Sequence, residues 1–335
     1  MPCLMMCIGA RSACLAAVLS LLAGALSAHG AALAWEPARP VQLIVGVSAG
    51  SAHDRTVRSI QNLLREGKLV TVPVVIVNRP GGGQTIATSY LSQSGADGHS
   101  LMLASVPLLA NKLTGKGTLT YTDLTPITQL FNEYIAIAVR KDSPLVTGKD
   151  LVAQFTKDAR SLTVAVGSAL GNGPHLALSL AMKEAGVAIR NVRAVVFSGG
   201  SEATLAVLGG HVDVLATTTG NVLPLVRSGQ MRVIAVSAPR RLSGTYAQVP
   251  TWKEQGIDSV FSSFRAIVGP KGLDARHVGY WERVFQQLAG MPAWLEEVER
   301  NNWQIAAQGV RESENFLRQE YARLQAVMTD LGLAK

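Results

Sequence analysis

Glycine- and serine-rich turns, each lying between a short apolar run and a helical pattern, are the segments of this sequence best suited to chemistry. One reads Ser48-Ala49-Gly50-Ser51-Ala52, and another spans 167–173. Such a turn directs several main-chain N–H groups to one point, where the helix dipole adds partial positive charge. Four such turns follow predicted strands, where open α/β sheets bind ligands. The pattern predicts a site for a carboxylate or phosphate, although the same residues also make ordinary turns and helix caps.

The first turn also permits an enzyme hypothesis. Gly46-Val47-Ser48-Ala49-Gly50 matches G-x-S-x-G, the nucleophile elbow of α/β-hydrolases. A secreted serine hydrolase would use Ser48, with His175 or His211 as base and Asp213 as acid. Against this alternative, the turn follows the first strand of the chain, and histidine precedes the acid, which reverses the order usual in that fold. We therefore predict a protein without catalysis.

Other cofactor and metal motifs are missing from the sequence. No glycine loop continues into Gly-Lys-Ser/Thr, and the six histidines show neither H-x-x-x-H nor H-E-x-x-H spacing. The three cysteines, Cys3, Cys7 and Cys14, all fall near the N-terminus. We expect no metal and no cofactor.

The turns belong to a repeated unit of strand, turn and helix. Apolar runs predict strands at 41–47, 74–78, 101–105, 134–140, 162–166, 192–197, 212–216, 232–237 and 264–268. Helical spacing predicts helices over 57–64, 176–184, 202–208, from the Thr217 turn through 226, and over 277–288, 293–301 and 312–331. Alternating strands and helices indicate α/β layers with mostly parallel sheet.

Two polar segments mark crossings between lobes. Lys141-Asp142-Ser143-Pro144 and Ala238-Pro239-Arg240 are where the chain would enter and leave a middle lobe. We predict lobe 1 from residues 35–140 and 239–335 and lobe 2 from 141–238. Two hinge crossings would then leave a cleft between the lobes.

Residues 1–34 have the pattern of a secretory signal peptide. Arg11 precedes an apolar run over 14–28, and Ala32-Leu33-Ala34 is an A-x-A cleavage pattern. The alternative is an uncleaved anchor, but a spanning helix needs about 20 apolar residues and this run is shorter. We expect cleavage near Ala34, a periplasmic location and no membrane insertion of the mature chain.

The composition excludes some classes of protein. Of 335 residues, 48% are hydrophobic and 16% charged, which is too apolar for intrinsic disorder. The formal net charge is +8, but the basic residues are scattered singly or in pairs. A nucleic-acid interface would gather them on one face, so we expect no nucleic-acid partner.

From Pro37 onward the sequence resembles the extracytoplasmic solute-binding receptors of tripartite tricarboxylate transporters, the Bug family. The resemblance rests on seven landmarks in register: 39–45 (RPVQLIV), Gly50 with Asp54, 77–83 (VNRPGGG), 96–101 (ADGHSL), 171–176 (GNGPHL), 208–213 (LGGHVD) and 249–256 (VPTWKEQG). It implies a two-lobed periplasmic-binding-protein fold, type II-like. Such receptors close on a small organic carboxylate and deliver it to the permease subunits of a membrane transporter; a receptor reused as a sensor is a further alternative.

Carried over to this chain, the resemblance implies two ligand-binding loops. They comprise Ser48, Ala49, Gly50, Ser51 and Asp54 in one lobe and Ser168, Gly171, Asn172, Gly173 and His175 in the other. Asp54 is equally suited to be the N-cap of the first helix. His175 is either a packing residue at a helix start or a direct ligand, and Asp213 is expected to organise the loops of lobe 2.

The chain departs from the family pattern at three places. Gly46, Ser48 and Ala49 stand where prolines are usual, and 197–199 (FSG) replaces a Tyr-Lys-Gly segment. The tryptophan near the second hinge is replaced by Phe264, with Arg265 beside it. These positions are where the resemblance places the distal part of a ligand, so they bear on which carboxylate is bound.

Overall fold

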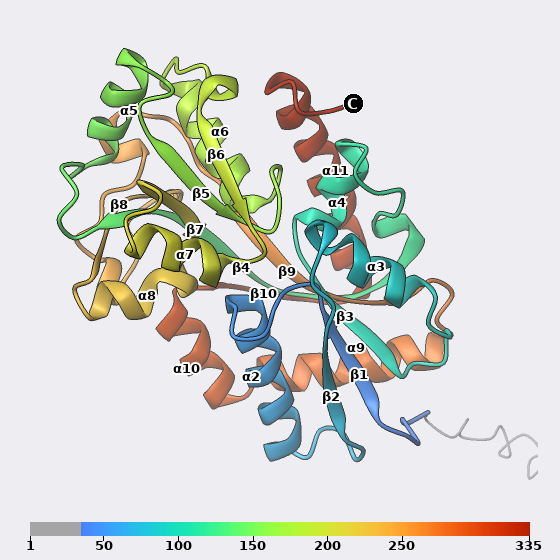
Figure 1. Ribbon diagram of the computed structural model, residues 1–335. Coiled ribbons are helices and arrows are strands. Elements are labelled where there is room, and N and C mark those ends of the chain that lie inside the picture. Colours follow the sequence, from blue (N-terminus) through green and yellow to red (C-terminus); the bar gives the residue numbers. More distant parts are fainter. Residues whose placement is uncertain (1–34) are drawn as a thin grey trace, which may run out of the picture. The chain divides into compact units, whose positions relative to one another are not determined.

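Two β-sheets that share one long strand organise this computed structural model, which describes residues 35–335 (Figure 1). The predicted signal peptide, residues 1–34, lies outside the described residues. The first sheet has the order β2-β1-β3-β9-β4, with β10 also paired to β4. Its strands are β1 (Val41–Val45), β2 (Val74–Asn78), β3 (Ser100–Ala104), β4 (Leu124–Arg140), β9 (Ser262–Pro270) and β10 (Gln304–Gln308).

Helices cover both faces of the first sheet because its central strands are buried on both sides. Leu101, Met102 and Leu103 of β3 are all almost completely buried, which is the continuous apolar run typical of parallel strands. One face packs on α2 (Ala52–Glu66) and α9 (Ala275–Ala289), the other on α3 (Thr85–Ser92), α4 (Pro107–Leu113) and α11 (Val310–Asp330). Helix α10 (Pro292–Asn301) packs against α9 and α8.

The second sheet repeats this layering. Its strands are β5 (Thr163–Gly167), β6 (Arg193–Phe197), β7 (Val214–Thr218), β8 (Met231–Val236) and the end of β4, in the order β6-β5-β7-β4-β8. The helices are α5 (Gly148–Lys157) and α6 (Gly173–Glu184) on one face, and α7 (Gly200–Leu208) and α8 (Thr219–Arg227) on the other. The sequence prediction missed α3, α4, α5 and β10.

Pairing within the sheets is mixed. Strands of the repeated strand-helix units, such as β1 with β3 and β5 with β7, are parallel as the sequence predicted. The crossing strands β4 and β9 pair antiparallel with each other and with the neighbouring units. Among the described strands, parallel pairing therefore occurs only between strands of the repeated units within each lobe. The strands that run between the lobes point the opposite way and pair antiparallel.

The two lobes are joined where β4 passes from one sheet to the other. Residues 124–134 of β4 pair with β9, and residues 135–140 pair with β7 and β8. The return connection runs from β8 through 237–261 into β9. The residue limits that we predicted for the two lobes stay a prediction.

Ser237 fastens these two crossings together. Its hydroxyl accepts a hydrogen bond from Ile135 N (2.9 Å) and donates one to Phe261 O (2.5 Å), and its own N–H donates to Ile135 O (2.9 Å). Ser237 is 1% exposed, so water does not replace these bonds.

We predict that Ser237→Ala lowers the free energy of unfolding by about 1–3 kcal/mol, because the buried Ile135 N–H loses its acceptor. Urea unfolding of the purified protein measures this. The matched control is Ser228→Ala, whose exposed hydroxyl bonds to Leu225 O and Gln230 Oε1 and should change stability by less than about 0.5 kcal/mol. Equal losses in both variants would contradict the role of Ser237.

Candidate functional site

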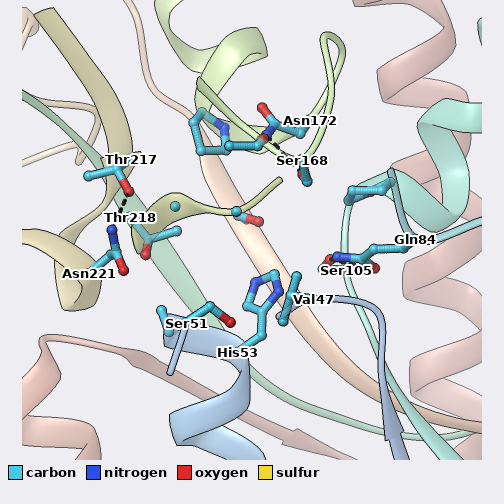
Figure 2. A pocket seen from close by; sticks show the side chains of 18 of the residues that line it. Val47, Ser51, His53, Gln84, Ser105, Ser168, Asn172, Thr217, Thr218 and Asn221 are labelled. Carbon is cyan, nitrogen blue, oxygen red and sulfur yellow. Dashed lines mark hydrogen bonds between the residues drawn. The ribbon is translucent and has the colours of Figure 1, made fainter. Parts of the chain in front are cut away.

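A pocket lies between the two lobes, at the strand ends where the glycine- and serine-rich turns meet (Figure 2). The first lobe contributes Val47, Ser51, Ala52, His53, Gln84, Ser105, Pro107, Ser263 and Arg265. The second contributes Gly167, Ser168, Asn172, Gly173, Pro174, Gly199, Gly200, Ala216, Thr217, Thr218 and Asn221. A ligand in this pocket contacts both lobes at once.

Four helices of the repeated units begin at the pocket wall, one of them α8, which starts after the lining residue Thr218. Helix α2 starts after Ser51, α6 after Asn172 and α7 after Gly199, and each follows directly on a strand of a repeated unit. The first-turn N–H groups of a helix have no partner within it, and its dipole makes this end partially positive. Neither Ser51 nor Gly199 caps its helix with a side chain. The pocket therefore presents main-chain donors from both lobes.

Ser51 adds a side-chain donor to this wall. It is 4% exposed, and its Oγ is buried without a hydrogen-bond partner among residues 35–335. Figure 2 shows Ser51 and His53 together at the start of α2, facing the second-lobe loops. A buried hydroxyl without a partner is costly, so an acceptor inside the pocket would satisfy it.

The second-lobe loop holds its shape through Asn172 and two close backbones. The Asn172 side chain accepts from His175 N (2.9 Å) and donates to Gly167 O and to Ser168 Oγ (3.3 Å). A Cβ on Gly167 would lie 2.5 Å from Gly200 N, so only glycine fits. Ser168 has a φ of 65°, a left-handed conformation that costs a non-glycine residue free energy.

Asp54 stabilises the conformation of the first loop through hydrogen bonds. It does not line the pocket, and α2 begins before it, at Ala52. Its carboxylate accepts from Gly50 N (2.8 Å), Asn78 Nδ2 (2.8 Å) and Arg58 Nε (2.8 Å). Burial alone would raise the pKa of Asp54, but these hydrogen bonds together lower it below its usual value. The Gly50 N–H is thus engaged by the chain itself.

His175 is likewise enclosed behind the pocket. Its Nδ1 accepts from Gly171 N (3.1 Å). Burial, and secondarily the positive charge of Lys116, lower the pKa of His175 to about 4, so it is neutral near pH 7 and able to accept that bond.

Asp213 accepts from the N–H and hydroxyl of Thr163 (2.7 Å each) and so ties β5 to the loop before β7.

Only some of the residues that the sequence predicted as ligand-binding line the pocket. Ser51, Ser168, Asn172 and Gly173 line it, whereas Ser48, Ala49, Gly50, Asp54, Gly171 and His175 lie in the same loops without lining it. Their ligand-binding roles stay predictions. Prediction from sequence did not name the lining residues Gln84, Ser105, Ser263, Thr217, Thr218 and Asn221. The last of these belongs to a turn that the sequence had already marked, and Arg265 had been noted only as a departure.

Charge in the pocket favours an anion. Among the described lining residues none is Asp or Glu, and Arg265 supplies a guanidinium that is 1% exposed. Burial and the nearby charge of Arg265 lower the pKa of His53 well below its usual value, so His53 is neutral near pH 7. Arg265 is ion-paired with Glu133 (2.7 Å), which lies outside the lining.

The groups required by the hydrolase alternative are not assembled into a triad. In the described chain, Ser48, His175 and Asp213 make no hydrogen bond to one another, and His211 is exposed. Nor do residues 35–335 contain a group of three or more His, Cys, Asp or Glu that would hold a metal ion.

Loops from the two lobes touch above the pocket. Ser201 Oγ donates to Gly50 O (3.2 Å), and Lys116 Nζ donates to Leu170 O (2.9 Å). These contacts link the two lobes near the pocket. The arrangement suits a small ligand that is enclosed on binding.

Comparison of the sequence with known proteins identifies the family of this chain. Residues 57–333 match the tripartite tricarboxylate transporter family receptor. The chain belongs to this receptor family. BugT of Bordetella pertussis is 28% identical over 308 residues, which cover 88% of this chain and 90% of that protein.

Solved receptors have the same fold. The periplasmic binding protein BugD is 25% identical, with a TM-score of 0.81 over 89% of this chain and 99% of that one. An R. palustris protein solved with adipate has the same identity, TM-score and coverage. The protein therefore has the two-lobed periplasmic-binding-protein fold, type II-like, with two hinge crossings, and is a solute receptor by family.

We predict that Asp54→Asn lowers the free energy of unfolding at pH 7 by about 1–3 kcal/mol, because an amide nitrogen would face donors that now bind a carboxylate. Since the folded-state pKa of Asp54 is lowered, its stabilisation is present above the usual carboxyl pKa of about 4 and is lost as pH falls through the lowered value. The difference between wild type and variant should shrink below about pH 4.

Chemical denaturation at a series of pH values measures this difference. Asp142→Asn is the control, because Asp142 forms an exposed ion pair with Arg140 and should change stability by less than about 0.5 kcal/mol. A difference for Asp54→Asn that stays constant down to pH 3 would show that its carboxylate is not the stabilising group.

Proposed function

We propose that the protein is a periplasmic receptor that binds a small organic carboxylate in the interlobe pocket and delivers it to the permease subunits of a tripartite tricarboxylate-type transporter, without catalysis. The observation that carries the proposal is the convergence of helix starts from both lobes on a pocket without an acidic lining residue among those described. A carboxylate supplies the acceptors that these starts need.

The physics of the pocket supports an anion over a neutral solute. A negative charge near a helix N-terminus gains about 0.3–1 kcal/mol, and up to about 2 kcal/mol in partly buried geometries. The Ser51 hydroxyl adds a donor, and closure removes competing water, which strengthens each interaction. The adipate bound in the structurally similar R. palustris protein supports the same ligand class.

Closure follows from where the ligand sits. The α2 start belongs to the first lobe and the α6 and α7 starts to the second, so only a closed cleft lets one carboxylate contact all three. A ligand that binds the closed form better shifts the population toward it. The closed receptor presents the joined rims of both lobes, near Gly50 and Leu170, to a membrane partner.

The proposed location and domain limits agree with this function. Among residues 35–335, no helix is long and apolar enough to cross a bilayer, and residues 1–34 supply the proposed export signal. Lobe 1 comprises residues 35–140 and 239–335, and lobe 2 residues 141–238.

Isothermal titration with mono-, di- and tricarboxylates and acidic amino acids tests ligand binding. We expect at least one carboxylate to give a heat of binding. A parallel fluorescence titration should show a change in tryptophan emission, because Trp303 stacks on Phe131 of the crossing strand β4. No heat with any anion would reject the proposal.

Within this experiment, Ser51→Ala should weaken carboxylate binding roughly tenfold or more, because a hydrogen bond to a charged group is worth about 1.5–3 kcal/mol. The same change should alter stability by less than about 0.5 kcal/mol, since the hydroxyl has no partner to lose in residues 35–335. Ser59→Ala, on the same helix but outside the pocket, should leave affinity unchanged. Unchanged affinity in Ser51→Ala would remove this hydroxyl from the site.

Export makes a separate prediction. When the full chain is expressed in a Gram-negative host, the periplasmic fraction should contain a protein whose first residue is Trp35, because cleavage follows Ala34. N-terminal sequencing measures this directly, and replacing Ala32 and Ala34 with arginine should leave the precursor uncleaved. A full-length chain held in the membrane fraction would instead indicate an anchor.

A further inference from the structure

A buried ion pair forms part of the pocket structure. Arg265 of β9 and Glu133 of β4 are 1% and 3% exposed at their side chains, and Arg265 Nη2 lies 2.7 Å from Glu133 Oε2. Burying two charges costs free energy that their attraction does not reliably return. Stability alone therefore does not explain a guanidinium at this place.

The guanidinium of Arg265 is fixed in orientation, but one of its N–H groups has no acceptor in the described chain. Its Nη1 donates to Ser263 Oγ (2.9 Å) and to Phe264 O (2.8 Å), while Nη2 donates to Glu133. The buried Nε–H has no acceptor within the described chain. Because Arg265 lines the pocket, a rigid cationic group with an unused N–H stands at the ligand site.

Glu133 does not accept from that Nε–H. Its second oxygen, Oε1, accepts from Gly220 N at the start of α8 (3.1 Å). Both carboxylate oxygens are thus committed, one to each lobe, and Glu133 holds Arg265 in place. His53, neutral near pH 7 because burial and Arg265 lower its pKa, adds no charge beside the pair.

The pocket thereby contains two distinct donor centres. The helix starts of α2 and α7 provide main-chain N–H groups, and α6 adds Gly173 N, since Pro174 has no N–H and His175 N is bonded to Asn172. Arg265 on the crossing strand β9 provides a charged side chain. A ligand with a second acceptor group can bond to both of them. A site built around a donor rejects analogues that lack its acceptor, because the donor then stays buried and unpaired.

We infer that Arg265 determines ligand specificity: it donates to a second carboxylate or other oxygen acceptor of the bound acid, and Glu133 is the residue that positions it. The receptor accordingly prefers acids with two acceptor groups over monocarboxylates of the same chain length. This inference rests on the proposed carboxylate-binding function.

Matched pairs of acids test the preference by isothermal titration at pH 7: succinate with butyrate, adipate with hexanoate, and malate with 3-hydroxybutyrate. For the pair that binds best, we expect wild-type protein to favour the dicarboxylate at least tenfold. The double variant Glu133→Gln with Arg265→Gln removes both charges together, so the net charge of the pair is unchanged. In it the preference should fall below about threefold.

A second variant separates the donor from the charge. Arg265→Lys keeps the positive charge but lacks the Nε–H, and it should lose most of the preference as well. The matched control is Arg232→Gln: Arg232 also has a buried Nε without a partner in the described residues, bonds to Ser143 O and Leu145 O, and does not line the pocket. It should retain the full preference. Circular dichroism and thermal melts identify which variants are folded, and either folded Arg265 variant decides the test.

The outcomes separate the two proposals. If wild-type protein binds no carboxylate, the proposed function and this inference both fail. If it binds carboxylates without preferring the second acceptor, or if a folded Arg265 variant keeps the wild-type preference, the inference fails and the receptor function stands.

Discussion

Unpaired main-chain N–H groups at helix starts are the constraint on which the rest of this structure depends. A buried N–H without an acceptor costs about 1–3 kcal/mol, and both α2 and α7 begin at the pocket without a side-chain cap. In an open cleft, water supplies the acceptors. Under the proposed function, closure excludes that water, and the acceptors of a ligand offset its loss. Anion selection and closure of the cleft would then be coupled.

This coupling requires lobes that move as rigid bodies about few residues. Strand β4 meets the requirement because it belongs to the first sheet up to Tyr134 and to the second from Ile135. Most of its side chains are locked by packing in one sheet or the other, which leaves the change of sheet as the place where rotation can occur. Ser237 ties the return crossing to the same point through Ile135 and Phe261. The two crossings are therefore joined at the point where β4 changes sheet.

The repeated strand-helix units were predictable because their signals are local. Each has a short apolar strand, a turn rich in glycine or serine and an amphipathic helix, as in β1 with α2. The first half of β4 was missed because bulges near Pro126 and Gln129 shift its register against β9, which destroys the alternation that marks a strand in sequence. Helix α5 was missed although Thr147 and Asp150 form a capping box, a signal that could have located its start. The Arg265 and Glu133 pair joins residues 132 positions apart in the chain, and no local pattern encodes that distance.

The four turns that look alike in sequence differ in which group accepts hydrogen bonds from the main-chain N–H groups at the helix start. At α8, Glu133 of the chain itself accepts from Gly220 N, so that helix start is already occupied by a carboxylate. At α6, the Asn172 side chain accepts from His175 N and leaves the turn only partly capped. At α2 and α7 no side chain caps the start among the residues described. Whether the chain itself supplies the acceptor at a turn therefore depends on a residue far away in sequence. At α8 that residue is Glu133, which also holds Arg265 at the pocket. The protein supplies one carboxylate internally at α8, and under the proposed function the ligand supplies another to the neighbouring starts.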